Sequence, residues 1–150
     1  MSIKLASHGH RVGEQALIPL VRELLQAWNA HDIDRAVTYY SADYEGVDVA
    51  QAAPQRGPEG IRDMLALYMR AFPDLHFAEE ATIVQGDQVA MFWTAQGTHQ
   101  GALMNIPPTG RAIQVRGVSL LTLSDGKVAR ALYIWDVAGL LRGIGLLPEL

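Results

Sequence analysis

The sequence has 150 residues, 49% of them hydrophobic and 19% charged, with a formal net charge of −4. Such a chain is typical of one domain with a single packed core. The absence of cysteine excludes disulfides, thiolate nucleophiles and cysteine-ligated zinc, and the lack of a lysine- and arginine-rich cluster argues against a nucleic-acid partner.

The first residues contain no continuous apolar segment of the secretory type, and no apolar run approaches the roughly 18 residues that span a bilayer. We therefore expect a cytoplasmic protein with no membrane partner. Residues 1–13 are expected to form a loose tail, and residues 14–150 a single domain.

Helical spacing of apolar residues dominates the first half of the chain. Apolar residues three or four positions apart predict a long helix from residue 14 to 28 and another from residue 58 to 72. Pro58 suits the first turn of the second of these helices. The expected buried faces consist of Leu17, Val21, Leu24 and Trp28 on the first helix, and of Ile61, Leu65, Tyr68 and Phe72 on the second.

The segment between these helices combines a cap, a strand and a loop. Asp32 is suited to cap a short helix that reaches Tyr40. A short strand is expected over residues 43–49, and the prolines and glycine over residues 52–58 predict a loop.

After residue 74 the apolar residues alternate with polar ones, which predicts strands. Ser124-Asp125-Gly126 is a strong hairpin signal between the last two strands, and Pro107-Pro108 lies in a loop over residues 101–110. A short helix is expected over residues 137–144. The four expected strands cover residues 75–84, 89–98, 113–123 and 127–137.

Helices followed by a run of antiparallel strands define an α+β protein whose helices cover one face of the sheet. We expect a cone-shaped, curved antiparallel sheet wrapped around the N-terminal helices. The mouth of such a cone is a natural place for a ligand.

Three stretches carry a resemblance to a known family. They are AWNAHDIDRAVTYYSADY at 27–44, GTHQG followed by PPTGR within 97–111, and SDGKVARALYIWD followed by GLLRGIG within 124–145. Their order resembles the nuclear transport factor 2-like superfamily, a cystatin-like roll, and within it the SnoaL-like polyketide cyclases.

The resemblance implies a cofactor-independent enzyme that holds a small hydrophobic, polyketide-like carbonyl compound in the cone. A carboxylate would act as general acid/base for an intramolecular aldol closure, with no metal. Asp136 occupies the family's aspartate position in the terminal WD element. Arg130 and Leu132 depart from the family, which often has an acidic residue and an aromatic residue in this stretch.

Asp136 ends an otherwise apolar strand and is the first candidate for catalysis. A carboxylate deprived of water has a raised pKa, which suits proton transfer near neutral pH. The same residue precedes a short helix, where a carboxylate accepts backbone N–H hydrogen bonds as an N-cap and its pKa falls. The resemblance favours the catalytic interpretation.

His99 is the second candidate, because its side chain exchanges protons near neutral pH. If Ser124 faces Lys127 across the hairpin, Asp136 faces about Val115, which in turn lies near Ala95. His99 would then lie about 13 Å along its strand from Asp136, at ~3.3 Å per residue. His99 is therefore expected at the mouth of the cone, or as a strand-end histidine bonded to loop backbone.

Large apolar side chains supply the expected substrate pocket. Which strand face looks into the cone is left open, because a slip of one residue reverses it. The expected pocket residues are Trp28, Tyr40, Tyr44, Met91, Trp93, Leu132 and Ile134.

Other charged residues have simpler interpretations. Asp43 and Asp48 are candidates for a second carboxylate, with Arg116 or Arg130 beside it, as in an epoxide-opening relative, but solvated loop and strand-edge charges are the favoured interpretation. The pair His8 and His10 lacks the further rigid ligands of a metal site, so we expect no metal and no cofactor.

Three functions remain open from the sequence. The first is the cyclase, and the second is an isomerase, dehydratase or epoxide-hydrolase-like enzyme in the same pocket. The third is a non-catalytic ligand-binding or dimerisation module. Because both faces of the last strands are apolar, we also expect a homodimer through the sheet.

Overall fold

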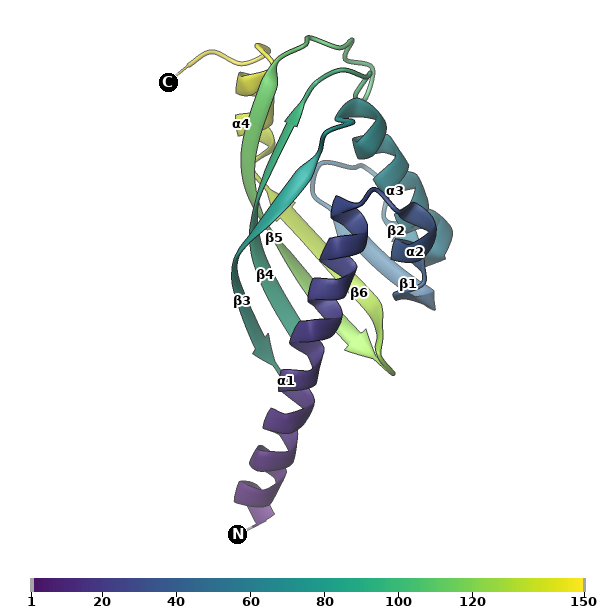
Figure 1. The fold of residues 1–150 in the computed structure, drawn as a ribbon, viewed down its shortest axis with the longest axis vertical. Helices are drawn as coiled ribbons and strands as arrows, with labels where there is room; N and C mark the ends of the chain where they lie inside the picture. The colour runs from purple at the N-terminus through teal and green to yellow at the C-terminus, as the bar shows by residue number, and fades with distance from the viewer. Residues whose placement is uncertain (1, 150) are drawn as a thin grey trace.

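The computed structural model describes residues 2–149, with side chains from residue 13 onward. Figure 1 shows a curved sheet with a long helix lying against it. In chain order the elements are α1 (Ser2–Asn29), α2 (Ile33–Val37), β1 (Tyr40–Asp48), β2 (Gln55–Arg56), α3 (Gly57–Ala71), β3 (His76–Gln85), β4 (Gln88–Thr98), β5 (Ala112–Ser124), β6 (Lys127–Trp135) and α4 (Val137–Gly143).

All six strands form one sheet in the order β2-β1-β6-β5-β4-β3. The expected α+β fold with a curved sheet is confirmed, but the sheet is mixed. The pair β1 and β6 is parallel, whereas the other neighbours are antiparallel. A parallel pair needs a long connection, and here β2, α3 and three strands separate β1 from β6 along the chain.

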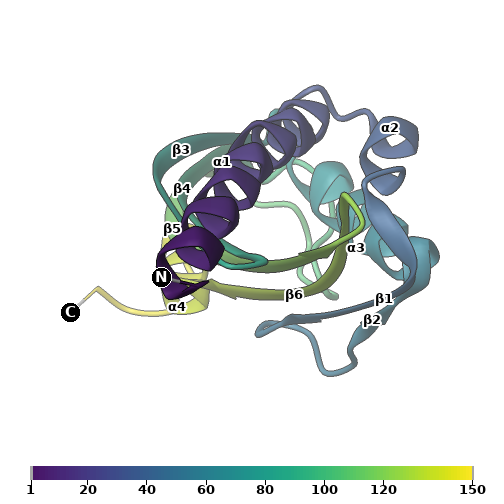
Figure 2. The same ribbon diagram turned by 90° about the horizontal axis from the view of Figure 1, so that it is seen from below.

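The long helices cover the concave side of the sheet, as Figure 2 shows for α1 and α3. The Asn29 side chain at the end of α1 pairs with the backbone of Phe77 in β3, donating to its carbonyl at 2.9 Å and accepting from its N–H at 2.8 Å. Arg22 also bonds Glu79 at 3.0 Å. These contacts fix the position of α1 relative to β3.

The N-terminal segment differs from its expectation. Residues 2–13 belong to α1, where the sequence predicted a loose tail, and Figure 1 shows this part of the helix projecting beyond the sheet. The predicted face is confirmed, with Val21, Leu24 and Trp28 buried. The division into tail and domain stays a prediction. Among the described residues, no helix is both long and apolar enough to cross a membrane.

The other boundaries shift by a few residues. Asp32 caps α2 as predicted, accepting a hydrogen bond from the Arg35 N–H at 3.1 Å, but α2 ends at Val37 and β1 already begins at Tyr40. The short strand β2 lies in the expected loop, because it pairs with β1. The predicted pairings of Ser124 with Lys127 and of Ala95 with Val115 are confirmed.

The buried side chains form two clusters. One lies between α1, α3 and the sheet and includes Trp28, Ile61 and Tyr133. The other lies towards α4 and includes Trp93 and Leu140. Residues of both clusters line the pocket described next.

Candidate active site

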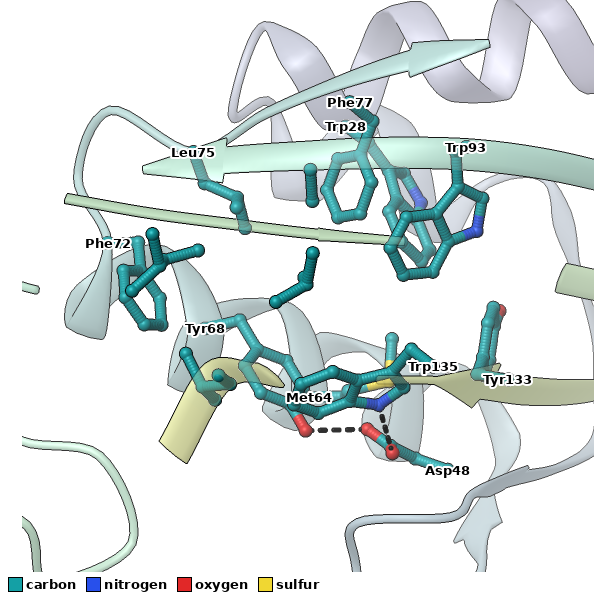
Figure 3. A pocket seen from close by; sticks show the side chains of 14 residues that line it. Trp28, Asp48, Met64, Tyr68, Phe72, Leu75, Phe77, Trp93, Tyr133 and Trp135 are labelled. Atoms are coloured by element: carbon teal, nitrogen blue, oxygen red, sulfur yellow. Dashed lines mark hydrogen bonds between the residues drawn. The ribbon is translucent and has the colours of Figure 1, made fainter. Parts of the chain in front are cut away.

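A pocket with a cavity of about 70 Å³ lies where the two buried clusters meet (Figure 3). Its wall is almost wholly apolar, and Asp48 is the one charged group that the described residues contribute to it. The residues around it are Trp28, Asp48, Met64, Tyr68, Phe72, Leu75, Phe77, Trp93, Ala95, Ile113, Val115, Tyr133, Trp135 and Leu140.

Asp48 is 2% exposed and accepts three hydrogen bonds. The Tyr68 hydroxyl donates to Oδ2 at 2.6 Å, and the Trp135 indole N–H donates to Oδ1 at 2.9 Å. The Ala50 backbone N–H donates to Oδ1, also at 2.9 Å. Figure 3 shows the carboxylate against Tyr68 and Trp135, across the pocket from Trp93. Three donors hold the carboxyl group in one orientation.

The parallel pair of β1 and β6 creates this arrangement. Asp48 ends β1 and is the cross-strand partner of Tyr133. Trp135 follows two residues after Tyr133, so both side chains lie on the same face of β6 and Trp135 reaches the carboxylate. Tyr68 comes from α3 and packs edge-to-face on Trp135, with ring centroids 6.0 Å apart.

The Tyr68 hydroxyl forms hydrogen bonds with both Asp48 and Gln51. Burial, reinforced by the hydrogen bond to Asp48, raises the pKa of Tyr68 above its ordinary value. The hydroxyl therefore stays protonated and donating throughout the neutral range. Its oxygen also accepts a hydrogen bond from the half-buried Gln51 amide at 3.1 Å.

The structure places Asp136 away from this pocket. Its side chain is exposed and accepts a hydrogen bond from the Gly139 N–H at 2.8 Å, as the N-cap of α4. The expected burial was wrong, because β6 ends at Trp135 and the next side chain turns towards solvent at the start of the helix. The capping interpretation is the one that the structure supports.

His99 is fully buried but is not among the residues around the pocket. Its Nδ1 accepts a hydrogen bond from the Thr109 N–H at 3.2 Å, and its ring lies 5.5 Å from that of Phe72. Its Nε2 has no partner among the described residues. The histidine thus anchors the loop that follows β4, and no hydrogen bond between the described side chains joins it to Asp136.

The seven expected pocket residues have four different outcomes. Trp28 and Trp93 line the pocket, while Tyr40 and Met91 line a second cavity beside it. Tyr44 is buried against Gln55, to which it donates at 2.8 Å. The prediction was wrong for Leu132 and Ile134, because both lie on the outer face of β6, where Ile134 is 47% exposed.

The other charged candidates lie outside the pocket. Asp43, Arg116 and Arg130 are exposed, and Arg130 lies 3.5 Å from Glu45. The side chains of His8 and His10 lie outside the described part of the chain. Among the described residues, the histidines and acidic side chains form no group of three that could hold a metal ion.

Sequence reasoning undervalued Asp48 and did not assign Tyr68, Tyr133 and Trp135 to the pocket. A signal was present: Asp48 lies four residues after Tyr44, so the two share a face of β1. Likewise Tyr133 and Trp135 share one face of β6. What the sequence lacked was which of these faces is covered.

The fold and its apolar pocket define a cone-shaped α+β domain of the nuclear transport factor 2-like class. The chain belongs to the SnoaL-like polyketide cyclase family, whose model matches residues 19–144.

Its relatives include cyclases from Streptomyces. The aklanonic acid methyl ester cyclase AcmA of Streptomyces galilaeus is 27% identical over 129 residues, which cover 85% of this chain and 90% of that protein. The nogalonic acid methyl ester cyclase of Streptomyces nogalater is 26% identical over 81% of this chain and 92% of its own length.

Among solved structures, AclR of Streptomyces galilaeus, provisionally assigned as a hydroxylase, superposes with a TM-score of 0.81 at 26% identity. The superposition covers 91% of this chain and 89% of AclR.

Proposed function

We propose that this protein closes a ring in a small, hydrophobic, polyketide-like carbonyl compound by an intramolecular aldol reaction, without a cofactor. Asp48 is the general acid/base. The observation that carries the proposal is a carboxylate, 2% exposed, on the wall of an otherwise apolar pocket. The names of the Streptomyces relatives support methyl esters of this type as the substrate class.

The reaction needs one group that takes a proton and gives it back. An Asp48 oxygen removes a proton from a carbon that lies between two carbonyl groups of the substrate. The resulting carbanion forms a bond to a ketone carbon in the same molecule, and the electron pair of that C=O moves to oxygen. Asp48 then returns the proton to this oxygen, so that the product has the same atoms as the substrate.

The surrounding side chains support these steps. Tyr68 and Trp135 position the carboxylate through their hydrogen bonds, so the base needs no rearrangement before proton transfer. The apolar walls exclude water, which strengthens electrostatic interactions in the pocket and protects the carbanion from random protonation. Aromatic rings such as those of Trp93 and Phe77 offer flat surfaces for a planar substrate.

The test compares Asp48→Asn with Asp136→Asn on aklanonic acid methyl ester and nogalonic acid methyl ester. Removing a general base costs about 10²- to 10⁴-fold in rate, so Asp48→Asn should lose at least about 100-fold in kcat. Asp136→Asn serves as the matched control, because this side chain is exposed and caps a helix; it should turn over the esters like the wild type.

Two results would overturn the proposal. Undiminished turnover by Asp48→Asn would remove Asp48 from the reaction. Absence of turnover of both esters by the wild-type protein would remove this substrate class. Circular dichroism and thermal unfolding of each variant would confirm that the fold is retained.

A further inference from the structure

A second cavity of about 30 Å³ adjoins the first, under α1. The two cavities share four aromatic residues: Trp28, Phe77, Trp93 and Tyr133. The partition between them is therefore one layer of side chains thick. By size, the second cavity accommodates about two water-sized groups, at roughly 10–15 Å³ each, so it admits a substituent rather than a ring.

Polar atoms gather around this second cavity. The Tyr40 and Tyr133 hydroxyls share a hydrogen bond of 3.3 Å. The Ser119 hydroxyl accepts a hydrogen bond from the Trp93 indole N–H at 3.0 Å. Each of these polar atoms therefore already takes part in at least one hydrogen bond.

The indole N–H of Trp28 is the exception. Trp28 is 9% exposed, and its Nε1 has no hydrogen-bond partner at bonding distance among the described residues. It lies near the Tyr40 hydroxyl: a hydrogen-bonding interaction with Trp28 lowers the pKa of Tyr40 against the larger, opposite effect of burial, but its geometry falls short of a formed hydrogen bond. A buried donor without a partner costs free energy, which an acceptor from a ligand would recover.

We propose that the second cavity is a subsite that recognises an acceptor oxygen of the ligand, a carbonyl, ether or hydroxyl oxygen, through the Trp28 indole N–H. The ring system of the ligand lies in the first cavity and the oxygen substituent lies in the second. The inference rests on the proposed function only in taking the first cavity as the place of the ring system.

The test uses two probes of the same shape, 2-methoxynaphthalene and 2-ethylnaphthalene, which differ by an acceptor oxygen in place of a methylene group. Neither probe donates a hydrogen bond, so neither gains one from Asp48. Equilibrium dialysis gives the ratio of their two dissociation constants for each protein variant.

Trp28→Phe removes the unpaired donor, and Trp93→Phe is the matched control. Trp93 lines both cavities as well, but its N–H is already bonded to Ser119. Trp28→Phe should shift the ratio against the methoxy probe by about 2- to 10-fold, which corresponds to one neutral hydrogen bond. Trp93→Phe removes ring surface that both probes contact, so it should weaken both probes alike and leave their ratio as in the wild type.

Side-chain NMR of the wild-type protein tests the same contact without a variant. The chain has three tryptophans, so their indole N–H signals are easily distinguished. The Trp28 signal should move further with the methoxy probe than with the ethyl probe. An unchanged ratio in Trp28→Phe, equal shifts with both probes, or no binding of either probe would overturn the subsite.

Asp48→Asn separates this inference from the proposed function. The variant should keep the wild-type ratio of the two dissociation constants even where it abolishes turnover. A failure of catalysis therefore leaves the subsite standing, and a failure of the subsite leaves Asp48 as the acid/base.

Discussion

Two aspartates at strand ends differ only in their surroundings. Asp48 ends β1 within the covered face of the sheet, where three donors satisfy its carboxylate. Asp136 follows β6 and is exposed, with its carboxylate on the first turn of α4. The same residue type thus serves as a candidate base in one place and as a helix cap in the other, because burial and not sequence context decides its solvation.

Four tyrosines should make the protein sensitive to alkaline pH. Burial raises the pKa values of Tyr40, Tyr44, Tyr68 and Tyr133. Below about pH 10 these groups are protonated in both states; above it the unfolded chain loses its protons first. The folded state then binds more protons, so the free energy of unfolding falls as pH rises.

Urea unfolding between pH 8 and pH 11.5 checks this expectation. Up to about pH 10, these four tyrosines should leave the free energy of unfolding unchanged. Above that pH the free energy of unfolding should decline. Tyr40→Phe should make the decline less steep, because one titrating group is removed. A free energy that stays level to pH 11.5 would contradict the expectation.

At the scale of elements, β5 supports the pocket through a glycine, Gly117, because this residue has no side chain to occupy the space beside the pocket wall. A Cβ at Gly117 would collide with the Trp93 ring and with the Cβ of Trp135. These two tryptophans form opposite parts of the pocket wall, and Trp135 also holds Asp48. The glycine therefore leaves the space in which both indoles pack.

Gly117→Ala should destabilise the protein by about 1–3 kcal/mol, the usual cost of overpacking. Displacement of Trp135 should also lower turnover. Urea unfolding and kinetics measure the two effects. Gly13→Ala is the control, because this exposed helical glycine has open space around it and the change should be neutral or slightly stabilising. Equal stabilities of the two variants would contradict the role of Gly117.

At the scale of the whole molecule, the outer face of the sheet carries an apolar band. Strand register aligns Phe92 with Val118 and Ile134, and Leu120 with Leu132 and Val47. Phe92, Ile134 and Val47 are 42%, 47% and 46% exposed. An exposed apolar band across several strands is typical of an interaction surface, so we propose that two copies of the chain pair through this face.

Sedimentation analysis at micromolar concentration tests the dimer. The wild-type protein should sediment as a dimer, and Ile134→Asp should shift it to the monomer by placing a charge in the interface. Leu146→Asp is the control, since Leu146 is also 53% exposed but lies beyond α4, outside the band. A monomeric wild-type protein would refute the proposed pairing.

Much of the fold followed from the sequence because it depends on local signals. The apolar spacing of α1 and α3, the cap at Asp32, the hairpin at Ser124 and the α+β order require only neighbouring residues and short-range geometry. The resemblance that those elements carry led to the same family as the family model.

The site required tertiary structure. Asp48 becomes a buried carboxylate only because β1 pairs in parallel with β6, more than 80 residues later in the chain, and because α3 brings Tyr68 onto the same face. For strands that are apolar on both faces, alternation does not tell which side is covered, which is why the expected pocket contained Leu132 and Ile134 and not Tyr133 and Trp135. Local signals predicted the order of the elements and all of them except β2 and the first part of α1; long-range pairing decided which carboxylate is removed from water.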